Sequence, residues 1–171
     1  MGLLKSPRRT RRRLRKGQRV NLPQDLTVFI ASDHRGFELK TRLVEDFPSL
    51  TDLGPVELNP DDDYNDAAIS VSKHVLNTPG SFGILICGSA IGVSIQANRF
   101  KKIRAAICSC PESAKLSRLH NDANVLCLSS DKIKSPEDYE KLKSTIIAFL
   151  ETKFSNEPRH VRRINRLDEE V

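Results

Sequence analysis

The amino-acid sequence predicts an α/β protein: a five-stranded parallel sheet covered by helices on both faces. Two observations predict this class. Short apolar runs rich in β-branched residues alternate with longer segments whose apolar residues have helical spacing, and this alternation is typical of a parallel sheet with crossover helices. The run 82–87 carries no charged residue, as expected of a strand buried on both faces.

The first half of the body alternates strand and helix. Residues 26–32 are a β-rich run, and residues 37–47 have near-helical apolar spacing that ends at Pro48. Residues 50–53 form a weak second strand. An acidic loop then leads to a helix over about 66–76.

The second half continues the same alternation. Three further strands are expected over 82–87, 103–108 and 125–128. Four further helices are expected after the turn at 88–92 through about 98, over 111–119 with Pro111 in its first turn, over about 136–152, and over about 159–168.

A basic N-terminal segment, residues 1–25, differs from the body, residues 26–171. Nine of the 28 Lys and Arg residues lie within 1–20 with no acid among them, so the remainder carries 19 basic against 22 acidic residues. Like charges at this density repel one another, and we expect the segment to be disordered. The net charge of +6 belongs to this segment, and we expect no specific nucleic-acid partner.

The extreme N-terminus carries a possible lipidation signal. Residues 1–6 (Met-Gly-Leu-Leu-Lys-Ser) fit the N-myristoylation pattern, in which Gly2 is acylated. One acyl chain binds a membrane only marginally, and an adjacent polybasic run supplies a second signal. A membrane-tethered pool is therefore one expectation. A solvated arm and a nuclear or nucleic-acid patch stay open as alternatives.

Other features favour a cytoplasmic protein. The apolar runs are too short for a membrane span, and we expect no secretory signal. The four cysteines have no C-x-x-C spacing, which argues against a zinc ribbon or thioredoxin motif and suits a reducing compartment.

Candidate chemistry gathers where strands end, because parallel sheets bind ligands beyond their carboxyl ends. Asp33 and His34 follow the first strand, and Cys87 leads into the small-residue turn at 88–92. This turn opens a helix, so its N–H groups can hold an anion or a developing oxyanion and can stabilise a Cys87 thiolate. A core cysteine before a tight turn is the alternative.

Further candidates come later in the chain. His120 precedes the fifth strand and has a side chain suited to proton transfer near neutrality. Arg159 and Arg163 share one helix face and could clamp a phosphate. A polar helix end and a solvated basic face are the alternatives. With Tyr64, these groups are expected at one sheet edge, where they suit proton transfer on a small phosphorylated substrate without metal or nucleotide.

Six segments occur in order along residues 26 to about 168. They are 32–40 (Ser-Asp-His-Arg-Gly-Phe-Glu-Leu-Lys), Asp63-Tyr64, 83–89 (Gly-Ile-Leu-Ile-Cys-Gly-Ser), 103–106 (Ile-Arg-Ala-Ala), 120–124 (His-Asn-Asp-Ala-Asn), and Arg159-His160 with Arg163. Together they resemble the B-type ribose-5-phosphate isomerases, whose wider family includes the galactose-6-phosphate isomerase subunits. The resemblance implies a Rossmann-like three-layer α/β/α sandwich and a cofactor-free homodimer with active sites at the subunit interface. It also implies interconversion of ribose 5-phosphate and ribulose 5-phosphate in the non-oxidative pentose phosphate pathway.

The resemblance also implies roles by position. Cys87 would move a proton between C1 and C2 through a cis-enediolate, and His120 would assist ring opening. The enediolate oxygen would be stabilised by the turn formed by Gly88, Ser89, Ala90, Ile91 and Gly92. The remaining contacts would be Asp33 near the sugar, His34, Arg159 and Arg163 on the phosphate, and Tyr64 and Asn121 lining the pocket. The histidine and the terminal arginines are expected to reach across from the partner subunit.

Four residues depart from the family pattern: Asn65, Ala90, Asp131 and Pro158. Two of them bear on the reaction. Ala90 stands where a second glycine is usual, and its methyl group could crowd the sugar or resist a positive φ. Asp131 stands in the place of a basic substrate contact, where an acid would repel a phosphate. Two alternative functions therefore stay open: an isomerase of a six-carbon sugar phosphate, and a non-catalytic sugar-phosphate-binding protein.

Overall fold

A computed structural model describes residues 19–169 except Gln24. Gly2 and most of the basic segment lie outside the described residues, and with them the expected disorder and lipidation signal. Val20 and Leu22, which the sequence places in the N-terminal segment, pack against the core, and the Val20 N–H donates to the Asp46 carbonyl at 2.7 Å. The described fold therefore includes residues before position 26.

Five parallel strands form one sheet in the order β2-β1-β3-β5-β4. The strands are β1 (Val28–Ser32), β2 (Leu50–Asp52), β3 (Phe82–Cys87), β4 (Ala105–Ile107) and β5 (Val125–Ser129). The helices are α1 (Phe37–Asp46), α2 (Tyr64–Asn77), α3 (Ile91–Ala97), α4 (Pro111–Asn121), α5 (Pro136–Glu151) and α6 (Pro158–Asn165), with a 3-10 turn η1 (Ser130–Lys132) after β5. The expected fold class is confirmed.

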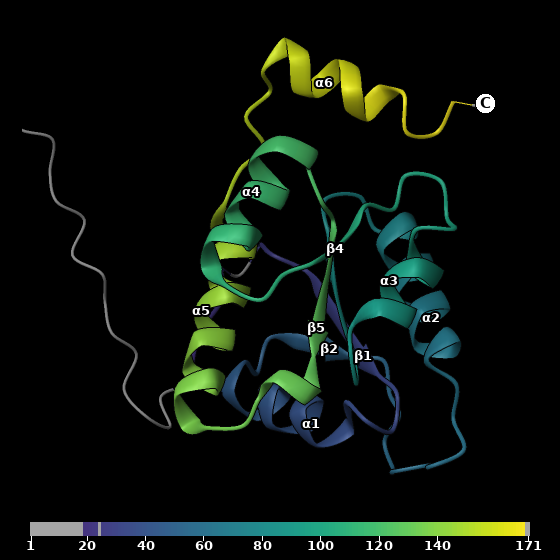
Figure 1. The fold of residues 1–171 in the computed structure, drawn as a ribbon, viewed down its shortest axis with the longest axis vertical. Coiled ribbons are helices and arrows are strands. Elements are labelled where there is room, and N and C mark those ends of the chain that lie inside the picture. The colour runs from purple at the N-terminus through teal and green to yellow at the C-terminus, as the bar shows by residue number, and fades with distance from the viewer. Residues whose placement is uncertain (1–18, 24, 170–171) are drawn as a thin grey trace, which may run out of the picture.

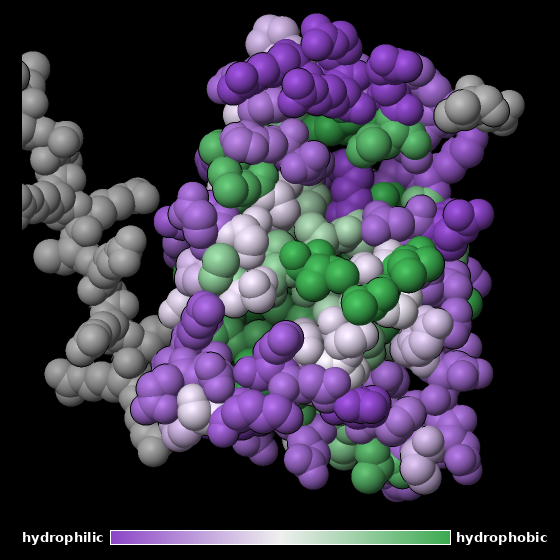
Figure 2. Space-filling model, in the orientation of Figure 1, coloured by the Kyte–Doolittle hydropathy of each residue, from purple (hydrophilic) through white to green (hydrophobic). Residues whose placement is uncertain are grey.

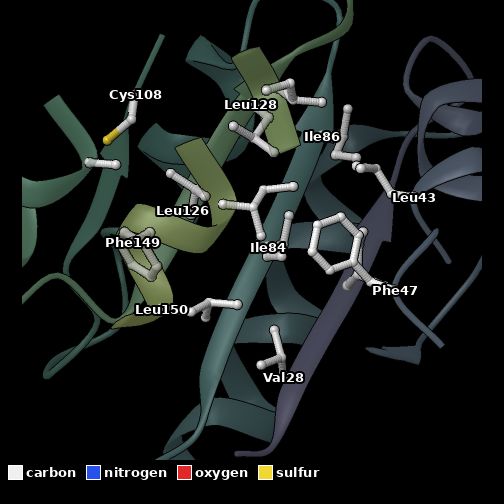
Figure 3. Close-up of a cluster of buried hydrophobic side chains, with 14 of the residues drawn as sticks. Val28, Leu43, Phe47, Ile84, Ile86, Cys108, Leu126, Leu128, Phe149 and Leu150 are labelled. Atoms are coloured by element: carbon white, nitrogen blue, oxygen red, sulfur yellow. The ribbon is translucent and has the colours of Figure 1, made fainter. Parts of the chain in front are cut away.

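Alternate residues of each central strand enter two separate hydrophobic clusters, because successive side chains of a strand point to opposite faces. Val28 and Ile84 pack with α1, α4 and α5 on one face. Figure 3 shows this cluster, with Phe47 and Phe149 filling the space between helices and sheet. Phe29 and Leu85 pack with α2 and α3 on the other face. Figure 1 shows the two groups of helices on opposite sides of the sheet.

The strand ends define two different edges of the molecule. The Asn124 carbonyl accepts from Gly83 N at 2.9 Å, and Asn124 N donates to the Arg104 carbonyl at 3.1 Å, so the segment before β5 lies at the amino edge. Helix α6 covers this edge, because Ser155 N, just before it, donates to the Leu119 carbonyl at 3.1 Å. In Figure 1 it crosses the top of the molecule, while the loop from β5 to α5 lies at the bottom, at the carboxyl edge.

Several elements differ from their expected bounds by one to three residues. Helix α2 begins at Tyr64, two residues early, because Asp63 already has the extended backbone of an N-cap. Strand β4 is shorter than expected because it is an edge strand, and the chain turns away after Ile107 towards α4. Helix α6 ends at Asn165. Among the residues described, no helix is long and apolar enough to cross a membrane.

Candidate active site

Cys87 is the last residue of the central strand β3, and it is buried. The backbone that follows it is held by the end of β5. The Gly88 carbonyl accepts from Ser129 Oγ at 2.6 Å and from Asp131 N at 3.1 Å, and the Cys87 carbonyl accepts from Ser130 Oγ at 3.2 Å. The thiol is therefore attached to a turn whose position is fixed from the neighbouring strand.

The turn at 88–92 adopts a left-handed conformation at a residue that is not glycine. Ala90 has φ 68° and is the N-cap of α3, a conformation that costs an L-residue about 1–2 kcal/mol. Its side chain is fully buried and packs in the cluster of α2 and α3. Ala90 thus accepts the positive φ and points its methyl group into the core. The expectation that its methyl group crowds a sugar is wrong.

Asp33 and His34 lie at the carboxyl end of β1, beside Cys87 in the sheet. The buried Asp33 carboxylate accepts from Gly36 N at 2.9 Å, and burial raises the pKa of Asp33, with the Gly36 hydrogen bond partly offsetting the rise. Asp62 accepts from the His34 backbone N at 2.9 Å, and its Oδ1 lies 2.7 Å from His34 Nδ1. This side-chain hydrogen bond raises the pKa of His34. The raised pKa favours the charged form of the ring, and that form would suit an anionic ligand.

Tyr64, the first residue of α2, extends over the same turn. A Cβ built on Gly92 would lie 2.7 Å from the Tyr64 ring, so a side chain at position 92 would displace the ring. Asn65 Nδ2 donates to Gln96 Oε1 at 2.7 Å and ties α2 to α3. The ring and the turn are therefore held as one unit.

Arg35 and Asp131 form a pair at this edge that the sequence does not predict. Arg35 Nη2 donates to Asp131 Oδ1 at 2.7 Å, and the Arg35 side chain lies across Gly88, where a Cβ would be 2.5 Å from its Nε. Asp131 therefore faces a guanidinium that balances its charge. No signal in the sequence connects the two, because they are 96 positions apart. Asp62, by contrast, belongs to the acidic loop that is plain in the sequence.

The remaining expected site residues lie at the amino edge of the same subunit. His120 is in the last turn of α4, and its ring contacts that of His160 of α6, with ring centroids 4.6 Å apart. Arg159 Nε donates to Glu157 Oε2 at 2.8 Å. Asn121 and Arg163 are exposed on the same two helices. Burial and the neighbouring His120 lower the pKa of His160.

The expectation that all these groups meet at one sheet edge is wrong for a single chain. Helix α4 runs antiparallel to the strands and therefore carries His120 back to the edge where β5 begins. Cys87 lies at the other end of the sheet, and the strand β3 alone spans about 17 Å at roughly 3.3 Å per residue. Within one subunit, the carboxyl edge holds Cys87, the turn, Asp33, His34 and Tyr64, and the amino edge holds His120, Asn121, Arg159 and Arg163.

The carboxyl edge has the groups for a proton transfer on an anionic substrate. It joins a thiol, a turn at a helix start that can hold an oxyanion, a histidine whose charged form is favoured, and an arginine. A thiolate can act as the base that removes a proton from carbon beside a carbonyl. His120, whose imidazole could exchange protons with oxygen atoms, lies at the opposite edge of the sheet in the same chain.

Comparisons with known proteins find a likeness over most of the chain. The family model described as Ribose/Galactose Isomerase matches residues 28–167. A probable ribose-5-phosphate isomerase B of Mycoplasma pneumoniae is 41% identical over 144 residues, which is 82% of this chain and 91% of that protein. Ribose-5-phosphate isomerase B of Mycobacterium tuberculosis is 32% identical over 148 residues, 84% of this chain and 89% of that protein.

Two solved structures extend the likeness to the fold. A ribose 5-phosphate isomerase of Thermotoga maritima matches with a TM-score of 0.76 at 38% identity, covering 85% of this chain and 99% of that one. Ribose-5-phosphate isomerase B of Mycoplasma genitalium, solved with bound ribulose 5-phosphate, matches with a TM-score of 0.73 at 37% identity, covering 84% and 94% of the two chains.

Proposed function

Because the chain belongs to the ribose/galactose isomerase family, we propose that it interconverts ribose 5-phosphate and ribulose 5-phosphate, an aldose–ketose step of the non-oxidative pentose phosphate pathway. The observation that carries the proposal is the match, over 84% of the chain, to an isomerase solved with ribulose 5-phosphate. The placement of Cys87 at the head of a strand-to-helix turn supports the same chemistry.

The proposed reaction moves one proton between neighbouring carbons of the open-chain sugar. The Cys87 thiolate takes the proton from C2, the C–H electron pair forms the C1–C2 double bond, and the carbonyl electrons move to O1. The proton of the C2 hydroxyl then passes to O1. The Cys87 thiol returns its proton to C1 as the C2 carbonyl forms. No electron acceptor is consumed, because aldose and ketose are isomers.

The turn at 88–92 is the part of the site that lowers the barrier most. A C–H proton beside a carbonyl is weakly acidic, so negative charge on the oxygen atoms must be stabilised while the proton is on sulfur. Each well-placed oxyanion donor contributes about 2.7–4 kcal/mol. The donors that we assign are the Ser89 backbone N–H and the Ser89 hydroxyl, whose oxygen accepts from Ile91 N at 3.2 Å, and Tyr64 covers the turn. His34, favoured in its charged form by Asp62, binds the phosphate.

We further propose that the protein is a homodimer in which each site is shared. Exposed apolar side chains gather on the face formed by α3, the edge strand β4 and α4, where Ile95 is 62% exposed; the others are Ile91, Ile107, Leu116 and Leu119. Figure 2 shows apolar residues at the middle of this face, surrounded by hydrophilic ones. A two-fold axis perpendicular to the strands would set the amino edge of one subunit against the carboxyl edge of its partner.

The shared site completes the chemistry. His120 of the partner subunit would open the furanose ring by exchanging a proton with its oxygen. Asn121 would line the pocket, and Arg159 and Arg163 would hold the phosphate opposite His34. This arrangement would bring the two separated sets of residues together around one substrate. It rests on the separation of the two edges within the subunit and on the apolar face.

The proposal includes a cytoplasmic location, because all four cysteines carry free thiols, as in reducing compartments. It treats residues 26–171 as the isomerase domain, extended by the segment with Val20 and Leu22 that packs on the core, and the basic run before that segment as a targeting sequence. In a fraction of the molecules, acylation of Gly2 beside the basic run would tether the protein to a membrane. Metabolic labelling with a myristate analogue tests this part, and an unlabelled Gly2 would remove the anchor.

The activity is tested by steady-state conversion of ribose 5-phosphate to ribulose 5-phosphate with purified full-length protein in the presence of EDTA. We expect turnover that survives chelation and is lost in Cys87→Ala, which should fold normally. A folded wild-type dimer without turnover would refute the pentose assignment. The same assay with six-carbon aldose phosphates would then test the alternative substrate class, and failure with both would favour a binding role.

A further inference from the structure

The carboxyl edge contains a cation that the proposed mechanism does not use. Arg35 follows β1, lies next to His34 in the chain, and extends across the backbone of Gly88, directly after Cys87. A Cβ at Gly88 would lie 2.5 Å from Arg35 Nε and 2.9 Å from its Cζ. The guanidinium therefore occupies the space above the first residue of the turn that we assign to the enediolate.

Asp131 fixes this position from the other side. Its Oδ1 accepts from Arg35 Nη2 at 2.7 Å, while its backbone N–H donates to the Gly88 carbonyl at 3.1 Å. One residue thus holds both the turn and the arginine that lies on it. The contacts join the ends of β1, β3 and β5, which are neighbours in the sheet.

The guanidinium keeps donors for a ligand. It has five N–H donors in a planar fork, one of them directed at Asp131, and its side chain is 56% exposed. The pKa of Arg35 is raised, mainly by its hydrogen bond to Asp131 and least by the charge of Cys87. The guanidinium therefore lies close enough to Cys87 for the two charges to interact. A cation at this place favours any negative charge that develops on sulfur or on a substrate oxygen above the turn.

We propose that Arg35 is a substrate-contact residue whose guanidinium binds the sugar oxygen that becomes negative in the enediolate, and that Asp131 is the positioning residue that holds it there. This inference rests on the proposed function, and it adds a side-chain cation to the backbone donors of the turn. It also explains the acid at position 131, which directs Arg35 rather than meeting the substrate.

The experiment compares three variants with the wild type in the ribose 5-phosphate assay. Arg35→Gln should lower kcat by about 10²-fold, the usual effect of losing one oxyanion donor, while KM changes little. Asp131→Asn keeps the cation but loosens it, and we expect a smaller loss of kcat. The double variant Arg35→Gln with Asp131→Asn replaces the ion pair by a neutral hydrogen-bonded pair, and its kcat should stay as low as that of Arg35→Gln.

The double variant separates contact with substrate from a merely structural role. If the ion pair only fastened the loops, the neutral pair would restore kcat, and that recovery would overturn the inference. Arg99→Gln, which removes an exposed arginine beyond α3, is the matched control and should keep wild-type kinetics. An active wild type with an unaffected Arg35→Gln would overturn this inference alone, whereas an inactive wild type would overturn the proposed function and this inference with it.

Discussion

Replacing Gly36 by alanine tests how closely the start of α1 approaches the central strand. A Cβ at position 36 would lie 2.8 Å from both Ile86 Cγ2 and the Ile86 carbonyl oxygen, and 2.9 Å from Ser32 Cβ. Two of these neighbours belong to the middle of the sheet, and the carbonyl is backbone. They cannot move aside as the end of a flexible side chain would, so the loop that carries Asp33 and His34 must move instead.

The magnitude follows from two opposing contributions. Forcing a methyl group into a filled space typically costs about 1–3 kcal/mol. Alanine reduces the conformational freedom of the unfolded chain, which stabilises the folded protein by about 0.4–1 kcal/mol where the native backbone suits it. Gly36 is such a position, because its φ is −90°. The net loss in the free energy of unfolding should be about 1–2 kcal/mol. For a protein of this size, the expected fall in Tm is about 2–8 °C.

The assay is urea unfolding of Gly36→Ala together with steady-state kinetics. We expect the lower stability to accompany a lower kcat, because the displaced loop also carries Asp33, whose carboxylate accepts from Gly36 N. Gly80→Ala is the control: it has open space around it but φ +83°, so it should lose about 1–2 kcal/mol through backbone strain and keep its kcat. A Gly36→Ala protein with wild-type stability and kcat would refute the argument from close packing.

Three further predictions concern charge, subunit exchange and strain. The pKa of His34 is raised by Asp62, so the stability that this pair contributes is fully present below the ordinary histidine pKa and is lost as pH rises through the raised value. Asp62→Asn should remove that pH dependence of the free energy of unfolding in urea titrations. An unchanged profile would contradict the assignment. Cys87→Ala and His120→Ala should each be inactive, yet a refolded equal mixture should recover roughly a quarter of the wild-type sites if sites are shared in a dimer; no recovery would point to sites within one chain. Ala90→Gly should change Tm by less than about 3 °C in thermal unfolding. Relief of about 1–2 kcal/mol of left-handed strain is offset by the loss of a buried methyl group and by a more flexible unfolded chain. A large shift of Tm in either direction would show that one of these contributions has been misjudged.

The sheet was predictable from the sequence because each central strand is apolar up to its last residue and is followed by a clear turn or helix signal. Val28 and Phe29, next to each other in the chain, are buried on opposite faces of the sheet. Both faces of such a strand are apolar, so the strand appears in the sequence as a continuous apolar run. The location of Cys87 at a strand end follows from the same pattern. Helix bounds were off by one to three residues where a cap such as Asp63 decided them.

The grouping of the site residues was not predictable in the same way. The position of His120 depends on the direction of α4, and a crossover helix necessarily returns the chain to the amino edge; placing every polar group at one edge overlooks this consequence of topology. The Arg35–Asp131 pair depends on which strands become neighbours in the sheet, and β1 and β5 are both next to β3 only in the folded order. Local pattern carries no information about such a contact.

The division of functional groups between the two ends of the subunit has a consequence for how activity is regulated by abundance. If each site is shared between two subunits, as we propose, a lone subunit holds two half-sites and no complete one. Turnover per chain would then follow the dimer fraction and would fall on dilution by mass action. Ile95 and Ile107 are exposed on the apolar face and have no part in the chemistry. Substitutions there would then lower activity at low protein concentration, and activity would return at high concentration. Concentration itself would act as the switch between an inert chain and a working enzyme.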